Sequence, residues 1–174
     1  MSRLHPPQRI IAIAPSTRGF GFAVLEGEAR LVDWGVKSAK GDKNIHSLEK
    51  VEALILQYQP AVMALEDASP DNSWRSARIQ ALNRELIALA GRRDLRVKVY
   101  PRERVRQALL SDGAGTKQDI AEALAKRFAA ELGARLPPKR KAWKSESYQM
   151  GIFDAVALAV TAYARPWSSL RWSG

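Results

Sequence analysis

The first third of the chain has the hydrophobic pattern of three consecutive β-strands. Residues 9–14 form a short, almost wholly apolar run closed by Pro15, which is typical of a central strand buried on both faces. After a turn at residues 16–19, Phe20, Phe22 and Val24 alternate with smaller residues, and a further extended stretch covers residues 31–36. We therefore predict that the domain opens with a three-strand meander.

The rest of the chain mixes helical spacing with two more strand-like runs. Helices are predicted over residues 44–58, from Ile79 to about Gly91, over 103–110, from Ile120 through Phe128 to Leu132, and from Ile152 to Tyr163; strands are predicted over 61–65 and 97–100. This order predicts one α/β domain over residues 1–174 with short irregular tails. Its five-stranded mixed sheet, with the three-strand meander first, would carry helices on both faces.

The composition narrows the classes of partner and metal site. The 174 residues carry 28 Lys and Arg against 18 Asp and Glu, a net charge of +10 that suits a polyanion but is also compatible with a solubilising surface or a passive RNA binder. The absence of cysteine excludes thiolate metal sites and leaves oxygen ligands. No apolar run approaches the ~20 residues of a membrane span, and Pro6 and Pro7 interrupt the N-terminus. We therefore expect a soluble, cytoplasmic protein without membrane association.

Three positions suggest a site at one edge of the sheet. Position 14 and Glu66 follow apolar strands directly, and the carboxyl ends of central strands meet at one crevice in such folds. Asp154 lies in an apolar helical stretch, where a buried charge needs a partner or a cation. A helix cap or a salt bridge would also explain Asp154, and acids are common at strand ends. The acids alone leave both readings open.

Four motifs in chain order add a family resemblance. These are residues 10–21 (IIAIAPSTRGFG), Ala64-Leu65-Glu66, residues 115–120 (GTKQDI) and residues 154–159 (DAVALA). Together they resemble the motifs of RuvC-type Holliday-junction resolvases in the ribonuclease H-like superfamily, with Lys117 at the family's lysine position. The resemblance extends from Arg9 to about Tyr163.

The resemblance implies a ribonuclease H-like fold and a structure-selective endonuclease that resolves four-way DNA junctions. An acid at position 14 would hold Mg²⁺, or Mn²⁺ as a substitute, together with Glu66 and Asp154, while Lys117 stabilises charge. It also implies a homodimer, with the helix that begins near Arg75 as the expected interface. A branch-migration motor as partner cannot be inferred from the sequence.

Two positions depart from the family pattern. Ala14 stands where the family has an aspartate, and Gly151 stands where it usually has a second acid or a histidine. A methyl group cannot coordinate Mg²⁺, so we expect catalysis to be disabled while metal-independent DNA binding survives. The retained Glu66, Lys117 and Asp154 favour a deliberate inactivating substitution at position 14, with a natural non-cleaving junction binder as the alternative.

The candidates for DNA contact are basic and aromatic residues around this edge. They are Ser16, Thr17, Arg18, Trp74, Arg75, Arg78, Lys117, Lys139, Arg140, Lys141, Trp143 and Lys144. Cations can contact phosphates, and an indole can stack on an unpaired base. Trp143 could equally cover the core, and Trp74 could be a packing residue at a helix start.

The sequence leaves three rival functions open. The first is a nuclease of the same fold that acts on other branched or RNA-containing DNA, and the second is the non-catalytic junction binder. A sugar-kinase or actin-like ATPase opens similarly but needs a second domain that 174 residues cannot supply.

Overall fold

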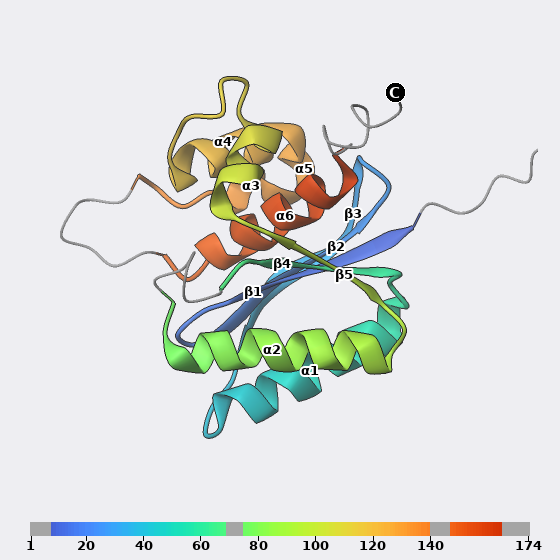
Figure 1. The fold of residues 1–174 in the computed structure, drawn as a ribbon. Coiled ribbons are helices and arrows are strands. Elements are labelled where there is room, and N and C mark those ends of the chain that lie inside the picture. The colour runs from blue at the N-terminus through green and yellow to red at the C-terminus, as the bar shows by residue number, and fades with distance from the viewer. Residues whose placement is uncertain (1–7, 69–74, 140–146, 165–174) are drawn as a thin grey trace, which may run out of the picture.

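A computed structural model describes residues 8–68, 75–139 and 147–164, and its strands form one mixed sheet of order β3-β2-β1-β4-β5 (Figure 1). The strands are β1 (Arg9–Pro15), β2 (Gly19–Glu26), β3 (Arg30–Ser38), β4 (Val62–Glu66) and β5 (Arg96–Tyr100). The first three pair antiparallel, and β4 and β5 add in parallel on the other side of β1. The predicted five-stranded mixed sheet with its opening meander is confirmed.

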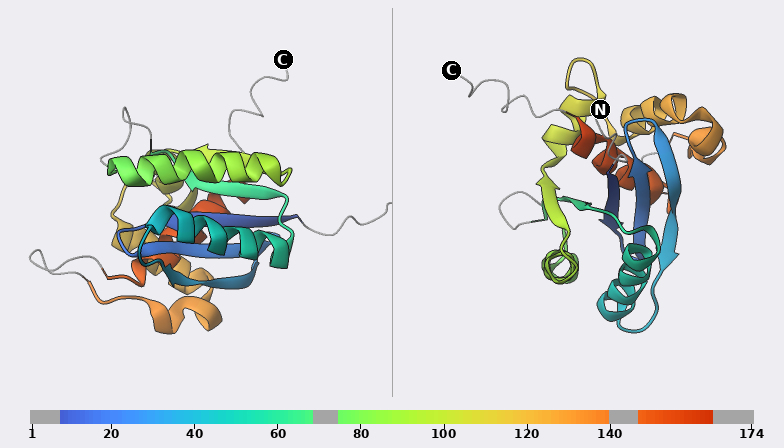
Figure 2. Two further views of the ribbon diagram at one scale, coloured as in Figure 1. Left: turned by 90° about the horizontal axis from the view of Figure 1, so that it is seen from below. Right: turned by 90° about the vertical axis from the view of Figure 1, so that its right-hand side faces the viewer.

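Helices cover both faces of the sheet, as predicted (Figures 1 and 2). One face carries α1 (Lys43–Tyr58) and α2 (Ala77–Arg92), and the other carries α3 (Arg102–Leu109), α4 (Lys117–Arg127), α5 (Ala129–Leu132), the 3₁₀ turn η1 (Gly133–Arg135) and α6 (Met150–Tyr163). The side chains of Asp42, Ser76 and Thr116 cap the first turns of α1, α2 and α4. None of the helices described is long and apolar enough to cross a membrane.

The alternation of side chains along the central strands divides the core into two layers. Ile11 and Ile13 of β1 pack with α1 and α2, whereas Ile10, Ala12 and Ala14 face α6. All five side chains are buried, so β1 is covered on both faces as its apolar sequence predicted. The side of the sheet that faces α6 is therefore also the side that Ala14 faces.

Small residues let α6 approach the sheet closely. A Cβ atom added to Gly21 of β2 would lie 2.1 Å from the carbonyl oxygen of Gly151, which no side chain could tolerate without a backbone shift. Gly21 is also the register partner of Ala14. The first turn of α6 is thus held directly over the end of β1.

One predicted helix is wrong in its extent. The apolar spacing of Ile120, Leu124, Phe128 and Leu132 predicted a single helix, but α4 ends at Arg127 and the short α5 follows it. Phe128 leaves the helical region at φ −117° and ψ 56°, although its ring remains buried. Because the bend keeps all four apolar side chains in the core, hydrophobic spacing alone could not reveal it.

Candidate active site

The ends of β1 and β4 bring Ala14 and Glu66 side by side. Ile13 is the register partner of Leu65, so Ala14 and Glu66 follow as the next neighbours, with Cα atoms about 5 Å apart at the usual strand spacing. In both strands the residues two positions earlier, Ala12 and Ala64, pack in the layer that contains α6. Position 14 and Glu66 therefore face the same side of the sheet as α6.

Asp154 reaches this edge from the first turns of α6 and pairs with Lys117. The Lys117 ammonium lies 3.3 Å from Asp154 Oδ2, and the two side chains are 31% and 24% exposed. Lys117 is the first residue of α4, where the Thr116 hydroxyl accepts from the Asp119 amide and the Asp119 carboxylate accepts from the Thr116 amide. The Thr116 backbone amide and hydroxyl both donate to the Asp119 carboxylate and lower the pKa of Asp119, which favours the charged carboxylate of the capping box that fixes the position of Lys117.

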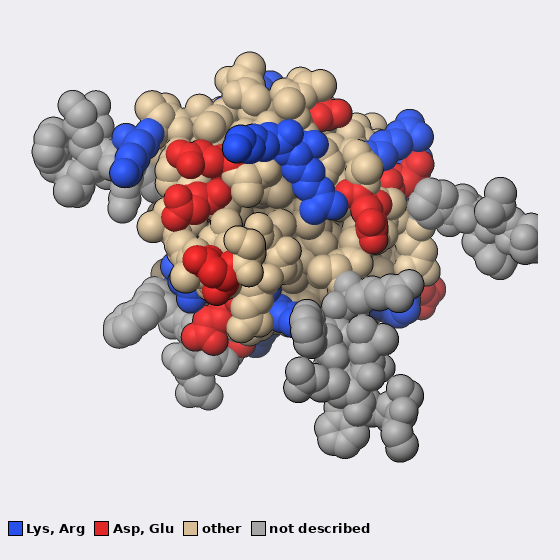
Figure 3. Space-filling model, turned by 90° about the horizontal axis from the view of Figure 1, so that it is seen from above, with Lys and Arg blue, Asp and Glu red and all other residues tan. Residues whose placement is uncertain are grey.

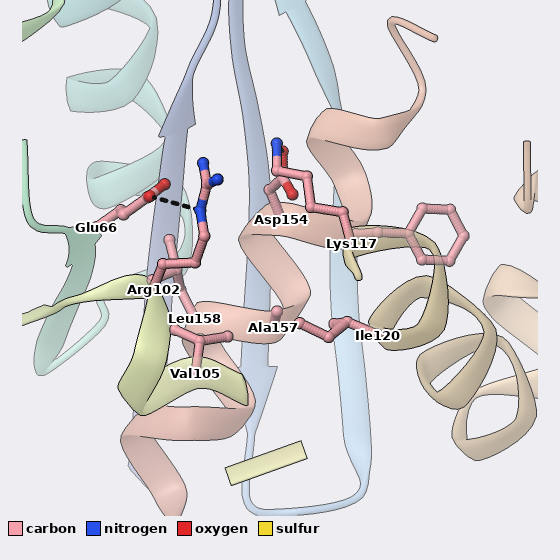
Figure 4. Close-up of a pocket in the computed structure, with 9 residues that line it drawn as sticks. Glu66, Arg102, Val105, Lys117, Ile120, Asp154, Ala157 and Leu158 are labelled. Carbon is pink, nitrogen blue, oxygen red and sulfur yellow. Dashed lines mark hydrogen bonds and ion pairs between the residues drawn. The ribbon is translucent and has the colours of Figure 1, made fainter. Parts of the chain in front are cut away.

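Glu66 is held by two arginines. Its Oε2 lies 3.1 Å from the Arg75 guanidinium, and its Oε1 lies 3.5 Å from Nε of Arg102. Arg75 also donates to the carbonyl oxygen of Pro15 at 3.3 Å, so it links the ends of β1 and β4. Figure 4 shows Arg102 rising from α3 toward Glu66, with Asp154 and Lys117 across the same cavity.

Two adjoining clefts contain these side chains. The inner cleft, of about 40 Å³, is lined by Glu66, Arg102, Val105, Lys117, Ile120, Phe153, Asp154, Ala157 and Leu158 (Figure 4). The outer cleft, of about 380 Å³, is lined by Ala14, Pro15, Ser16, Thr17, Arg18, Arg75, Ile79, Lys117, Ser147, Tyr148, Gly151 and Asp154. Lys117 and Asp154 line both clefts. In the outer cleft, the Arg18 guanidinium lies over the Tyr148 ring, 5.7 Å from the centre of the ring. The arrangement brings Glu66 and Asp154 to one edge of the sheet with basic groups around them, and basic groups favour phosphate as a ligand.

Comparison with known sequences identifies the family. The model of the family described as "Crossover junction endodeoxyribonuclease RuvC" matches residues 10–162. The chain belongs to this family. A crossover junction endodeoxyribonuclease RuvC from Pelodictyon phaeoclathratiforme is 26% identical over 129 residues, covering 69% of this chain and 68% of the relative.

Solved RuvC structures share the fold. Thermus thermophilus RuvC matches with a TM-score of 0.65 and 19% identity over 90% of this chain and 94% of its own. The same protein in complex with a Holliday junction substrate matches with a TM-score of 0.64 and 17% identity over 90% of this chain and 93% of its own. The yeast mitochondrial Holliday junction resolvase Ydc2 matches with a TM-score of 0.55 and 12% identity over 92% of this chain and 79% of its own. The predicted ribonuclease H-like fold is confirmed.

The residues present do not fit a two-metal RuvC site. Such a site needs a carboxylate that bridges two ions about 3.5–4 Å apart, and position 14 offers a methyl group that is 5% exposed. In the described ranges no three His, Cys, Asp or Glu residues are grouped closely enough to hold a metal ion. Both remaining carboxylates of the inner cleft are paired with cationic side chains. These residues would hold at best a single, weakly bound ion.

The candidate DNA-contact residues fall into four groups. Ser16, Thr17, Arg18 and Lys117 line the outer cleft. Arg75 and Arg78 make internal contacts, because the Arg78 guanidinium donates to the Ser16 carbonyl oxygen at 3.0 Å and to Asn44 Oδ1 at 3.1 Å. Lys139 is exposed and lines neither cleft. Trp74, Arg140, Lys141, Trp143 and Lys144 lie outside the described residues.

Two residues of the site were missed from the sequence. Arg102 follows Pro101 at the start of α3 and contacts Glu66, and Tyr148 precedes α6 and stacks with Arg18. The only signal for Arg102 was its position directly after the strand that neighbours β4, where helix starts meet the carboxyl ends of strands. Tyr148 carried no pattern that could have indicated its contact.

Proposed function

We propose that this chain recognises four-way DNA junctions as RuvC-type resolvases do and that, with Ala14 in place, it holds them without cutting. The observation that carries the proposal is the meeting of Ala14, Glu66 and Asp154 at one edge of a RuvC fold, with Arg75, Arg102 and Lys117 paired to the two acids. Membership of the RuvC family and the likeness to a RuvC bound to a Holliday junction support the four-way junction as ligand.

The underlying reaction would be hydrolysis of a phosphodiester bond near the crossover. It requires an acid at position 14 that, with Glu66 and Asp154, binds Mg²⁺ or, as a substitute, Mn²⁺. Lys117 is suited to contact the phosphate, since its ammonium faces the clefts through its pair with Asp154. As written, the chain keeps the phosphate-binding groups and lacks the bridging ligand.

The test compares the chain with its Ala14→Asp variant on four-way junctions, flaps and linear duplexes in Mg²⁺. We expect both proteins to bind junctions more tightly than duplex, and only the variant to nick, with nicks confined to four-way junctions. Equal cleavage of all substrates would indicate a broader nuclease of the same fold. Equal affinity of both proteins for junction and duplex would reject the proposal.

A natural non-cleaving junction binder is the second candidate, and Gly151 is the observation that favours it. The position lacks a family ligand, and a Cβ atom there would meet Gly21 Cα and Val36 Cγ1, both at 3.4 Å, so a larger side chain needs its neighbours to adjust. We would therefore also make Ala14→Asp combined with Gly151→Asp. Junction binding without cleavage by both acid variants would favour the binding module.

A homodimer through α2 is part of the proposal, because resolution of a four-way junction needs two symmetric cuts. Ile87 of α2 supports this choice, since it is a large apolar side chain that is 42% exposed. Sedimentation should show a dimer that Ile87→Glu shifts toward the monomer, whereas Ile45→Glu on α1, at 53% exposure, should not. An unaltered dimer in the first variant would refute the assignment. We place this activity in the cytoplasm.

A further inference from the structure

A second group of basic residues lies beyond the clefts, where β3 ends and α1 begins. We call it the basic patch and define it as Lys40, Lys43, His46 and Lys50. With Ser38, three of these residues (Lys40, His46 and Lys50) line a shallow hollow of about 440 Å³. Lys40, His46 and Lys50 are exposed, and Lys43 is half-buried. The four motifs of the family resemblance, at residues 10–21, 64–66, 115–120 and 154–159, do not include this segment, so its charge needs its own explanation.

A chain of contacts joins the basic patch to the outer cleft. The Lys43 ammonium donates to the Thr17 carbonyl oxygen at 2.5 Å. The Ala39 amide donates to the Arg18 carbonyl oxygen at 2.9 Å. The Ser38 hydroxyl lies 3.1 Å from the Tyr148 hydroxyl, and Tyr148 stacks with Arg18. The Lys50 ammonium in turn contacts the Ser38 carbonyl oxygen. Hydrogen bonds therefore connect the turn that lines the outer cleft to the end of β3 and to two lysines of α1, Lys43 and Lys50.

The register of the sheet sets the distance between the patch and position 14. Ala14 pairs with Gly21, which pairs with Val36, and Ser38 lies two residues further along β3. Two strand spacings and two residues of rise place Ser38 about 12 Å from Ala14, and the lysine side chains extend beyond it. A DNA duplex rises about 3.4 Å per base pair, so a duplex that leaves the outer cleft would pass the patch roughly four to six base pairs from position 14.

The charge of the patch is not a general property of the surface. Figure 3 shows the face above α3 to α5, where acidic and basic side chains are interspersed. In the patch, by contrast, three lysines (Lys40, Lys43 and Lys50) outnumber the two nearby acids, Asp42 and Glu49. Figure 1 shows the connection between β3 and α1 at the same end of the molecule as the turn between β1 and β2. The patch therefore extends the basic rim of the outer cleft in one direction.

We propose that the basic patch binds the phosphate backbone of one duplex arm, roughly four to six base pairs from the crossover. The inference rests on the proposed function, since it assigns an arm of the same four-way junction to this surface. Ammonium groups on flexible stems contact phosphates without reading bases, so the contact fixes the direction of the arm and adds affinity regardless of its sequence. The chain thus recognises a junction through its arms as well as through its crossover.

The test is the salt dependence of junction binding by a triple variant, Lys40→Gln, Lys43→Gln and Lys50→Gln. Loss of two to three phosphate contacts should reduce the slope of log K against log salt by about 2 to 3 and weaken binding about 10-fold to 100-fold at low salt. The matched control is Lys126→Gln, Arg127→Gln and Arg135→Gln, which removes the same charge from exposed positions of α4 and η1. We expect the control to leave the slope within one unit of that of the unaltered protein. Equal changes of the salt slope and of the junction affinity in the patch variant and in the control variant would overturn the proposal.

A second measurement locates the contact on the DNA. Neutral methylphosphonates replace the phosphates at steps three to seven of each arm. The unaltered protein should lose affinity for this junction, whereas the patch variant should bind both junctions equally. If the patch variant loses as much affinity for the methylphosphonate junction as the unaltered protein does, the proposed contact is refuted. Failure of the unaltered protein to prefer junction over duplex would instead reject the proposed function, so the two failures are distinguishable.

Discussion

Placing an acid at position 14 is the sharpest perturbation of this molecule, because it should make the stability of the domain depend on a divalent cation. Ala14 is 5% exposed and is the next register neighbour of Glu66. The Cα atoms of the two positions lie about 5 Å apart, and two carboxylates at a separation of the same order repel each other by about 3 kcal/mol at an effective dielectric constant of 20, before nearby cations offset part of that repulsion. The melting temperature of Ala14→Asp in a chelator should therefore fall below that of the unaltered chain.

Mg²⁺ should reverse this loss in the variant alone. At a free concentration tenfold above the dissociation constant, binding to the folded state contributes about 1.4 kcal/mol. For a domain of this size that amount raises the melting temperature by about 3–6 °C. The unaltered chain should show no rise beyond that of a monovalent salt of equal ionic strength, since its carboxylates are already paired with Arg75, Arg102 and Lys117.

Differential scanning calorimetry over a Mg²⁺ titration measures both effects. Ala14→Asn is the matched control, because it adds nearly the same volume without the charge. We expect the asparagine variant to be insensitive to Mg²⁺. A Mg²⁺-dependent rise of the same size in the unaltered chain, or in the asparagine variant, would refute the argument that position 14 supplies the missing ligand.

Three further predictions concern the scaffold. Gly21→Ala should destabilise the fold by about 1–3 kcal/mol through overpacking, because its Cβ atom would lie 2.1 Å from the Gly151 oxygen. Gly91→Ala, with no atom within 4 Å of the added Cβ, should stabilise α2 by about 0.5–1 kcal/mol, and chemical denaturation measures both changes. The hydrogen bond that Tyr58 donates to Asp33 raises the pKa of Tyr58 to about 12 from 10.0, so its contribution to stability is complete below pH 10 and is lost as the pH rises to about 12. Thermal unfolding between pH 9 and 12 should therefore show a steeper fall for the unaltered chain than for Tyr58→Phe, and parallel curves would contradict this.

The elements that form the edge of the site could be predicted because their sequences are locally consistent. The apolar runs of β1 and β4 are short and end in turns, and the two sites that follow them, position 14 and Glu66, are fixed by strand geometry alone. Asp154 could be singled out because a charge is costly in an apolar helix. These inferences need only the period of the pattern and the chemistry of the side chain.

The contacts that complete the site could not be predicted, because they depend on how distant elements pack. Arg75 was expected to contact DNA, yet its guanidinium bonds to Glu66 and to the Pro15 carbonyl oxygen. Arg102 meets the other oxygen of Glu66 only because β5 pairs with β4 and delivers the start of α3 to that edge. No periodicity in the sequence encodes which carboxylate a long, flexible arginine side chain will reach.

These pairings change what an alanine at position 14 means for the site. In the two clefts, the carboxylates of Glu66 and Asp154 face four cationic side chains, those of Arg18, Arg75, Arg102 and Lys117. The lining therefore carries a formal net charge of +2, which attracts a phosphate without help from a metal ion and opposes the entry of a divalent cation. A divalent cation that bound Glu66 would have to displace one or both arginines from its oxygens. Under the proposed function, the arginines that would attract DNA to this site are therefore also the groups that must move before a metal ion can reach Glu66.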